Sequence, residues 1–246
     1  MSRPAPFVRA VAAQAAMEAR LTARRGENLL AMIVLPTVAL VFFGSVGFGA
    51  GPASLDRLLP AILALAIVAS CLVNLGIATA YERGYGVLKR LGGAPLGTAG
   101  LIVAKLTVVA GIAILQVIAL VALAAALGWS PSLVLSWGGV ALATVAGVAT
   151  FAGIGMLIAG SLRAEAALVV ANALFLVAIL TGGVVVPTHD LPGALSGVTS
   201  LLPFGALTNA FDAMMTGAGD LTGSLIILLA WAAAAFIGAA RTFRWD

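Results

Sequence analysis

Six long apolar runs, separated by short stretches that hold nearly all of the charge, constrain this sequence more than any other feature. A helix needs roughly 20 mainly apolar residues to cross about 30 Å of hydrocarbon, and each run is of that order. The runs cover residues 29–48, 58–80, 101–127, 133–161, 166–186 and 221–240. We therefore expect an all-α integral membrane protein with six transmembrane helices.

The composition favours the same conclusion. Hydrophobic residues make up 62% of the chain and charged residues 9%, and the mean hydropathy is +1.16. Soluble domains typically have about 45–50% apolar and about 25% charged residues. The net charge of +4 does not indicate nucleic-acid binding, because the basic residues lie at the ends of apolar runs and form no single patch.

A cleaved signal peptide is the alternative interpretation of the first run. Arginines precede it, and Gly49-Ala50-Gly51 is similar to a small-residue cleavage site. The apolar part of a signal peptide is usually about 7–15 residues long, and this run is longer. We therefore expect a retained span.

The distribution of Lys and Arg predicts the orientation. If the N-terminus is cytoplasmic, all but one of the 13 basic residues fall on the cytoplasmic side, and only Arg57 lies outside. The cytoplasmic set is Arg3, Arg9, Arg20, Arg24, Arg25, Arg83, Lys89, Arg90, Lys105, Arg163, Arg241 and Arg244. We expect a multi-pass protein of the cell membrane with both termini in the cytoplasm.

Residues 1–28 form a cytoplasmic segment in which residues 7–25 are rich in alanine and contain neither Gly nor Pro, which predicts a helix. Its two sides differ. Phe7, Val8, Val11 and Leu21 share one side, Arg9, Arg20 and Arg24 the other, and Gln14, Glu18 and Arg25 intrude on the apolar side. We expect an amphipathic helix at the membrane surface, with a solvated extension as the alternative.

The sequence offers little for chemistry. It contains no G-x-x-x-x-G-K-[ST] motif, so we expect no nucleotide site, no bound cofactor and no enzymatic activity in this chain. His189 is the only histidine and Cys71 the only cysteine, so no metal site is expected. We interpret His189-Asp190 as a polar turn that starts a helix and Cys71 as a packing residue.

Few polar residues lie within the apolar runs. Lys105, the only charged one, is near enough to the start of its run to extend toward the headgroups. The absence of an acidic residue argues against a proton-coupled carrier. Asn74, Gln116 and Asn172 either contact a substrate or hydrogen-bond to neighbouring helices, and both possibilities stay open.

Two segments resemble the membrane subunits of type-2 ABC exporters, a family that includes drug and antibiotic export permeases. After its second span this family carries a segment of the form E-R-x-x-G-T-L-x-R-L-x-x-x-P. The residues that match are Glu82, Arg83, Gly86, Leu88, Arg90, Leu91 and Pro95, with Lys89 as a common companion. Before the last span the family has a proline pattern, matched by Gly183, Pro187, Leu191-Pro192, Pro203, Phe204 and Asn209.

The resemblance implies that residues 29–246 form the transmembrane domain of an exporter of this type. Such a chain pairs with a second permease chain, as a homodimer or heterodimer, and binds two copies of a separate ATPase subunit that holds ATP and Mg²⁺. Short helices outside the membrane, re-entrant or interfacial, are expected between the fifth and sixth spans. Asn209 and Asp212 there would face the exit path or the interface, and with Asn74, Gln116 and Asn172 they are the candidates for the substrate path.

The segment after the second span would be a cytoplasmic coupling helix that docks on the ATPase. In a helix over residues 82–91, Tyr81, Tyr85 and Leu88 fall along one face, while Lys89 and Arg90 point elsewhere. Gly84, Tyr85 and Gly92-Gly93 depart from the family pattern, and we expect the helix to end at the glycine pair and turn at Pro95. The candidate coupling residues are Tyr81, Glu82, Arg83, Tyr85, Leu88, Lys89 and Arg90. A plain solvated basic loop is the alternative.

Two functions follow from these patterns. The first is the permease subunit of an ATP-driven exporter that works by alternating access. Spans without charge in their middle suit a hydrophobic or amphipathic small molecule, such as a drug, an antibiotic or a lipid-like compound. The second is a membrane anchor or assembly factor whose basic loop recruits a cytosolic partner without moving solute.

Overall fold

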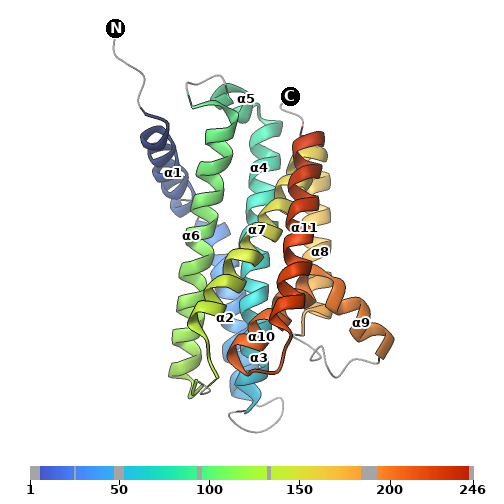
Figure 1. Cartoon of the computed structure of the whole chain (residues 1–246). Helices are drawn as coiled ribbons and strands as arrows, with labels where there is room; N and C mark the ends of the chain where they lie inside the picture. The colour runs from blue at the N-terminus through green and yellow to red at the C-terminus, as the bar shows by residue number, and fades with distance from the viewer. Residues whose placement is uncertain are drawn as a thin grey trace.

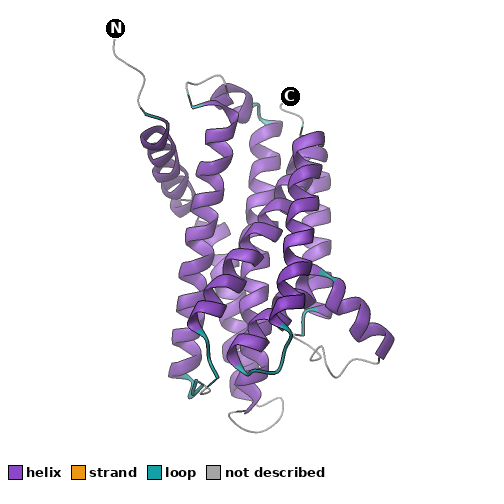
Figure 2. Ribbon diagram, viewed as in Figure 1, coloured by secondary structure: helices purple, strands orange, loops and turns teal. Residues whose placement is uncertain are grey.

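The computed structural model describes residues 6–24, 26–46, 53–92, 96–131, 134–183 and 193–243. Within these ranges every regular element is a helix and there is no strand, as Figure 2 shows. The predicted all-α class is therefore confirmed for this part of the chain.

The helices run in a bundle whose two ends are distinct (Figure 1). In chain order they are α1 (Phe7–Arg24), α2 (Gly26–Val46), α3 (Ala53–Val68), the π-helix η1 (Ala69–Asn74), α4 (Leu75–Gly84), α5 (Val87–Gly92), α6 (Gly97–Ala126), α7 (Trp137–Ser161), α8 (Ala164–Thr181), α9 (Gly193–Leu201), α10 (Pro203–Met215) and α11 (Leu221–Thr242). The start of α1, the short helix α5 and the end of α11 lie at one end, and α10 lies toward the other. The start of α3 lies at that second end as well.

Five helices in the described ranges are long and apolar enough to cross a membrane. They are Leu55–Gly84, Ala99–Ala126, Trp137–Ser161, Ala164–Thr181 and Leu221–Thr242. The described apolar stretch of α2 is shorter, Met32–Ser45, so the first predicted span stays a prediction. Several bounds also differ by a few residues from those predicted; for example, the second run continues as a helix to Gly84, the fourth begins at Trp137, and the fifth ends at Thr181.

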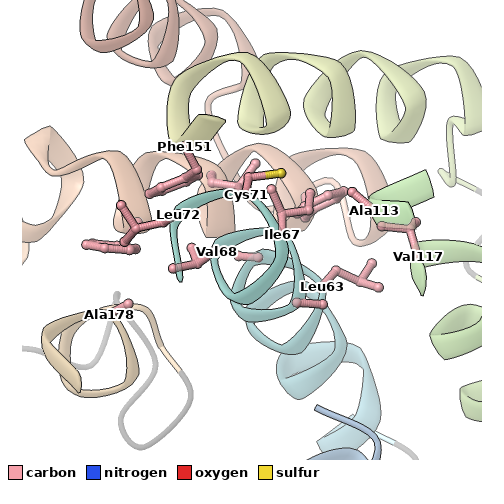
Figure 3. Packing of buried hydrophobic residues seen from close by; sticks show 14 of the residues in the cluster. Leu63, Ile67, Val68, Cys71, Leu72, Ala113, Val117, Phe151 and Ala178 are labelled. Carbon is pink, nitrogen blue, oxygen red and sulfur yellow. The ribbon is translucent and has the colours of Figure 1, made fainter. Parts of the chain in front are cut away.

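The continuous helix formed by α3, η1 and α4 is the centre of the bundle. In its most apolar stretch 83% of the residues are buried, against 17% for α8. Figure 3 shows Leu63 and Leu72 of this helix amid side chains of α6, α7 and α8, among them Val117 and Phe151. Apolar burial on every side explains why residues 59–69 of this helix are all apolar.

A glycine contact brings the central helix against α7. A Cβ atom added to Gly155 would lie 2.6 Å from the carbonyl oxygen of Cys71, closer than real Cβ atoms approach. On the other helix, a Cβ atom at Gly76 would lie 3.2 Å from the carbonyl oxygen of Gly155. Glycine at both positions therefore allows the two backbones to touch, as small residues do between membrane helices.

Local sequence signals set where several helices begin. The Ser136 side chain accepts a hydrogen bond from the backbone N–H of Gly139, and that of Asp220 from the N–H of Gly223. These are N-caps of α7 and α11, which satisfy N–H groups that have no partner inside the helix. Pro203 occupies the first turn of α10, where its missing N–H is not needed.

Two helices, α9 and α10, lie between α8 and α11, as the sequence predicted. Most of α10 is buried against α3, α7 and α11, and the ring of Phe204 stacks on that of Phe151 with centroids 5.0 Å apart. In contrast, α9 projects from the bundle, and its Leu201 carbonyl accepts a hydrogen bond from the Trp231 indole. Both segments are helical, whereas their re-entrant or interfacial position stays a prediction.

Candidate functional site

The predicted coupling segment consists of two helices joined by a turn, and not of one continuous helix. α4 ends at Gly84, Tyr85 and Gly86 form a turn, and α5 follows over Val87–Gly92. Gly86 has φ +69°, a left-handed conformation that glycine adopts without strain. The predicted continuous helix over residues 82–91 is therefore wrong, although α5 does end at the first of the two glycines. Pro95 lies outside the described residues.

The break changes which side chains are presented to the outside. Tyr85 is 74% exposed and its ring lies 6.1 Å from that of the half-buried Tyr81, whereas Leu88 is only 2% exposed. The predicted common face of Tyr81, Tyr85 and Leu88 is thus wrong, because the turn directs Leu88 inward. Val87 and Lys89 are exposed beside Tyr85. The side chain of Arg90 lies outside the description.

Arg83 faces the bundle and binds the end of another helix. Its guanidinium donates to the backbone carbonyls of Gly160 and Leu162, at the C-terminal end of α7. The last carbonyls of a helix have no partner within it and carry partial negative charge, so a cation stabilises them. Arg83 therefore joins the end of α4 to the end of α7.

Glu82 also points inward, toward Lys105 of α6. The Lys105 Nζ atom lies 2.6 Å from Oε2 of Glu82 and 3.0 Å from Oε2 of Glu18 on α1. Lys105 is buried, so the expectation that it extends toward the headgroups is wrong. Sequence reasoning did not connect it with Glu18, which lies 87 residues away. The signal was present: an amine at an apolar position needs a carboxylate partner.

A groove of about 590 Å³ collects five of the candidate residues, two from the substrate-path set and three from the coupling set. Asn74 of the π-helix and Asn172 of α8 both line it, as does Tyr81. The rest of the lining comes from α2, the central helix, the α4–α5 turn and α8: Met32, Leu35, Ala69, Val73, Ile77, Ala78, Glu82, Tyr85, Val87 and Phe175. A mainly apolar surface with two amides suits a ligand that is itself mainly apolar.

Gln116 lies outside this groove and is buried between helices. Its side-chain N–H donates to the Met32 carbonyl of α2 at 2.7 Å, and its oxygen accepts from the Ser70 hydroxyl at 2.7 Å. Of the two possibilities for Gln116, the structure thus shows the interhelical hydrogen bonds.

Asn209 and Asp212 lie on α10, away from the groove. A carboxylate oxygen of Asp212 accepts from the hydroxyl of Thr216 at 2.8 Å, and the Asp212 carbonyl accepts from the backbone N–H of the same residue. Both candidates are partly buried. The structure therefore separates them from Asn74 and Asn172.

No group of residues suited to hold a metal ion occurs within the described ranges. His189 and Asp190 lie outside those ranges, as do Pro187 and Leu191-Pro192 of the proline pattern. The described cysteine, Cys71, is buried in the core, which agrees with its interpretation as a packing residue.

The family described as ABC-2 type transporter matches residues 11–216. This range includes the α4–α5 turn, the groove and the whole of α10. No curated protein matches the chain at a significant level.

Proposed function

Because the chain belongs to the ABC-2 type transporter family, we propose that it is the permease subunit of an ATP-driven exporter. The observation that carries this proposal is a family match over most of the chain, together with five long apolar helices in its described ranges. The chain contains no P-loop, so ATP and Mg²⁺ would be bound by a separate ATPase subunit, in two copies per transporter.

In this proposal the protein spans the cell membrane six times, with α2 as the first span. The end of the bundle that carries the start of α1, α5 and the end of α11 faces the cytoplasm. In the sequence, all but one of the 13 basic residues belong to segments predicted to lie on that side. The exposed apolar residues Phe7 and Val8 of α1 would then enter the inner membrane surface.

The ATPase would dock on the α4–α5 turn, through a smaller surface than the sequence predicted. Tyr85, Val87 and Lys89 are exposed there, which leaves an aromatic ring, an aliphatic side chain and a cation for a partner. Glu82, Arg83 and Leu88 face inward and would transmit motion to α6, α7 and the bundle core. Docking and transmission are thus assigned to different residues of one motif.

The groove between α2, the central helix and α8 would become the substrate path at an interface between two permease chains. Asn172 is exposed on α8, although its amide donates to the Leu168 carbonyl. An amide exposed to hydrocarbon is unfavourable, so this face should meet protein or a wet cavity. The largely apolar lining favours a hydrophobic or amphipathic substrate, including drugs, antibiotics and lipid-like molecules.

The test is co-expression of the chain with an ATPase encoded beside it. Tyr85→Ala/Lys89→Glu should reduce ATPase co-purification, ATP turnover and export together. Trp137→Ala is the matched control, because Trp137 is 57% exposed and begins α7, a helix that starts toward the other end of the bundle. If export by the double variant is unchanged, the proposal that the ATPase docks on the turn is wrong. An assembled complex that moves none of a panel of compounds would favour the membrane-anchor alternative.

A further inference from the structure

Lys105 lies between two carboxylates from different helices, and all three side chains are largely removed from solvent. The exposed fractions are 5% for Lys105, 11% for Glu18 and 13% for Glu82. Glu18 is held in turn by the amide of Gln14, which donates to its other oxygen at 3.1 Å. The cluster thus joins α1, α4 and α6 at one point.

The way in which α1 is attached makes this cluster unusual. Glu18 is the only buried residue of α1, while its large apolar residues Phe7, Val8 and Met17 are mostly exposed. An amphipathic helix on a protein surface normally buries its apolar side, whereas α1 buries a charged residue. Its attachment to the bundle therefore includes a buried ion pair at Glu18.

Buried charges make such an attachment specific. Removing one partner leaves another charge desolvated without compensation, which is far less favourable than losing an exposed ion pair. Here a single ammonium serves two carboxylates, so losing Lys105 would leave two negative charges facing each other.

We propose that Lys105 is a positioning residue. Its ion pairs with Glu18 and Glu82, which we call the clamp, hold α1 at the end of α4, so that α1 and the α4–α5 turn move as one unit. The inference about transport rests on the proposed function: the docking surface would carry α1 with it when an ATPase moves. The clamp itself is a property of the isolated chain and can be tested without a partner.

A small cavity beside the clamp supplies a matched control. It has a volume of about 40 Å³, and Thr79 lines it together with the three charged residues. The Thr79 hydroxyl is buried and has no hydrogen-bond partner among the described residues. Thr79→Val changes the same cavity without touching a charge, so it should leave the clamp intact.

The first experiment measures distances in the isolated permease in lipid nanodiscs. Spin labels at Arg20→Cys on α1 and Lys89→Cys on α5 should give a narrow distance distribution, which stays narrow in Thr79→Val. Lys105→Met should broaden it, Lys105→Arg should restore it, and Glu18→Gln/Lys105→Met should be no broader than Lys105→Met alone. A distribution that is broad in the parent protein, or still narrow in Lys105→Met, would overturn the proposal.

The second experiment uses the unlabelled complex with its ATPase. Lys105→Met should keep ATP hydrolysis and lose at least about fivefold in export per ATP, as expected when a coupling free energy between sites is removed. Lys105→Arg should recover this ratio. If the ratio does not change in Lys105→Met, the role in transport is overturned. If no ATPase assembles, the proposed function fails, and the distance measurement still decides the clamp.

Discussion

The side chain of Gln116 donates a hydrogen bond to the carbonyl oxygen of Met32, which lies four residues before Pro36 in α2. A proline inside a helix has no N–H for the carbonyl four residues earlier and so leaves it without its usual donor. Gln116, on α6, supplies that donor across the helix interface. Membrane helices tolerate proline when a neighbouring helix satisfies the freed group in this way.

The first prediction concerns this pair. Gln116→Leu should destabilise the protein by about 1–3 kcal/mol, because the buried Met32 carbonyl loses its donor. Pro36→Ala should largely rescue the Gln116→Leu variant, since residue 36 would then supply an N–H within α2. Thermal unfolding in detergent measures both effects. If Pro36→Ala gives no rescue, the carbonyl freed by proline is not the reason for the Gln116 contact.

The second prediction concerns Arg83 and the end of α7. Arg83→Gln should lower the free energy of unfolding by about 1.5–3 kcal/mol, because two carbonyls lose a charged donor. Arg83→Lys should recover only part of it, since an ammonium lacks the guanidinium fork that reaches both oxygens. Lys89→Gln is the control, because Lys89 is exposed on the same segment. Equal stability of Arg83→Gln and Lys89→Gln would contradict the prediction.

The third prediction compares one substitution at two glycines. Gly155→Ala should destabilise by about 1–3 kcal/mol, because the new methyl group overlaps the Cys71 carbonyl and separates two packed helices. Gly111→Ala has no atom within 4 Å of the added carbon and should be neutral or stabilising by up to about 1 kcal/mol. The free energy of unfolding in detergent distinguishes the two variants. Equal stability of Gly155→Ala and Gly111→Ala would contradict the close approach of α7 to the central helix at Gly155.

The fourth prediction concerns the proposed contact between two permease chains. The only cysteine, Cys71, is buried, so cross-linking of an introduced cysteine can be assigned to its own position. Val169 lies three residues before Asn172 on the same side of α8 and is 66% exposed. Val169→Cys should therefore cross-link two copies in the membrane if the protein is a homodimer.

Leu115→Cys is the matched control for this experiment. Leu115 is 68% exposed but lies on α6, outside the groove. Stronger cross-linking at Leu115 than at Val169 would place the interface elsewhere. No cross-link at Val169 in the homogeneous protein, together with one to a co-expressed sister chain, would indicate a heterodimer.

The sequence predicted the helices well because each apolar run carries its own signal in length and composition. Hydropathy alone located the central span, and caps such as Ser136 and Asp220 account for helix starts. The break at Gly86 was missed because a glycine in a family motif does not show whether it lies within a helix or in a left-handed turn. That single dihedral angle decided that Leu88 is buried.

The roles of the candidate residues were harder to predict than the helices. A polar residue in an apolar run either contacts a substrate or hydrogen-bonds to a neighbouring helix, and its spacing in the sequence does not distinguish the two. Asn74 and Asn172 come together at the groove, whereas Gln116 binds other helices. The pairing of Lys105 with Glu18 depends on how α1 folds back along α6, and no local pattern encodes that contact. This ion pair was not predicted because its two residues lie 87 positions apart in the sequence, although the need of a buried lysine for a carboxylate partner was evident.

The π-helix in the central span has a consequence for everything that follows it. A π turn holds about one residue more than an α turn, and each residue of an α-helix advances about 100° around the axis. The residues Ala69–Asn74 therefore fix the rotational phase between the two halves of the central helix. If the same residues formed regular α turns instead, Glu82 would turn about 100° away from Lys105, so the π conformation of this segment specifies the ion pair as strictly as the charged residues do.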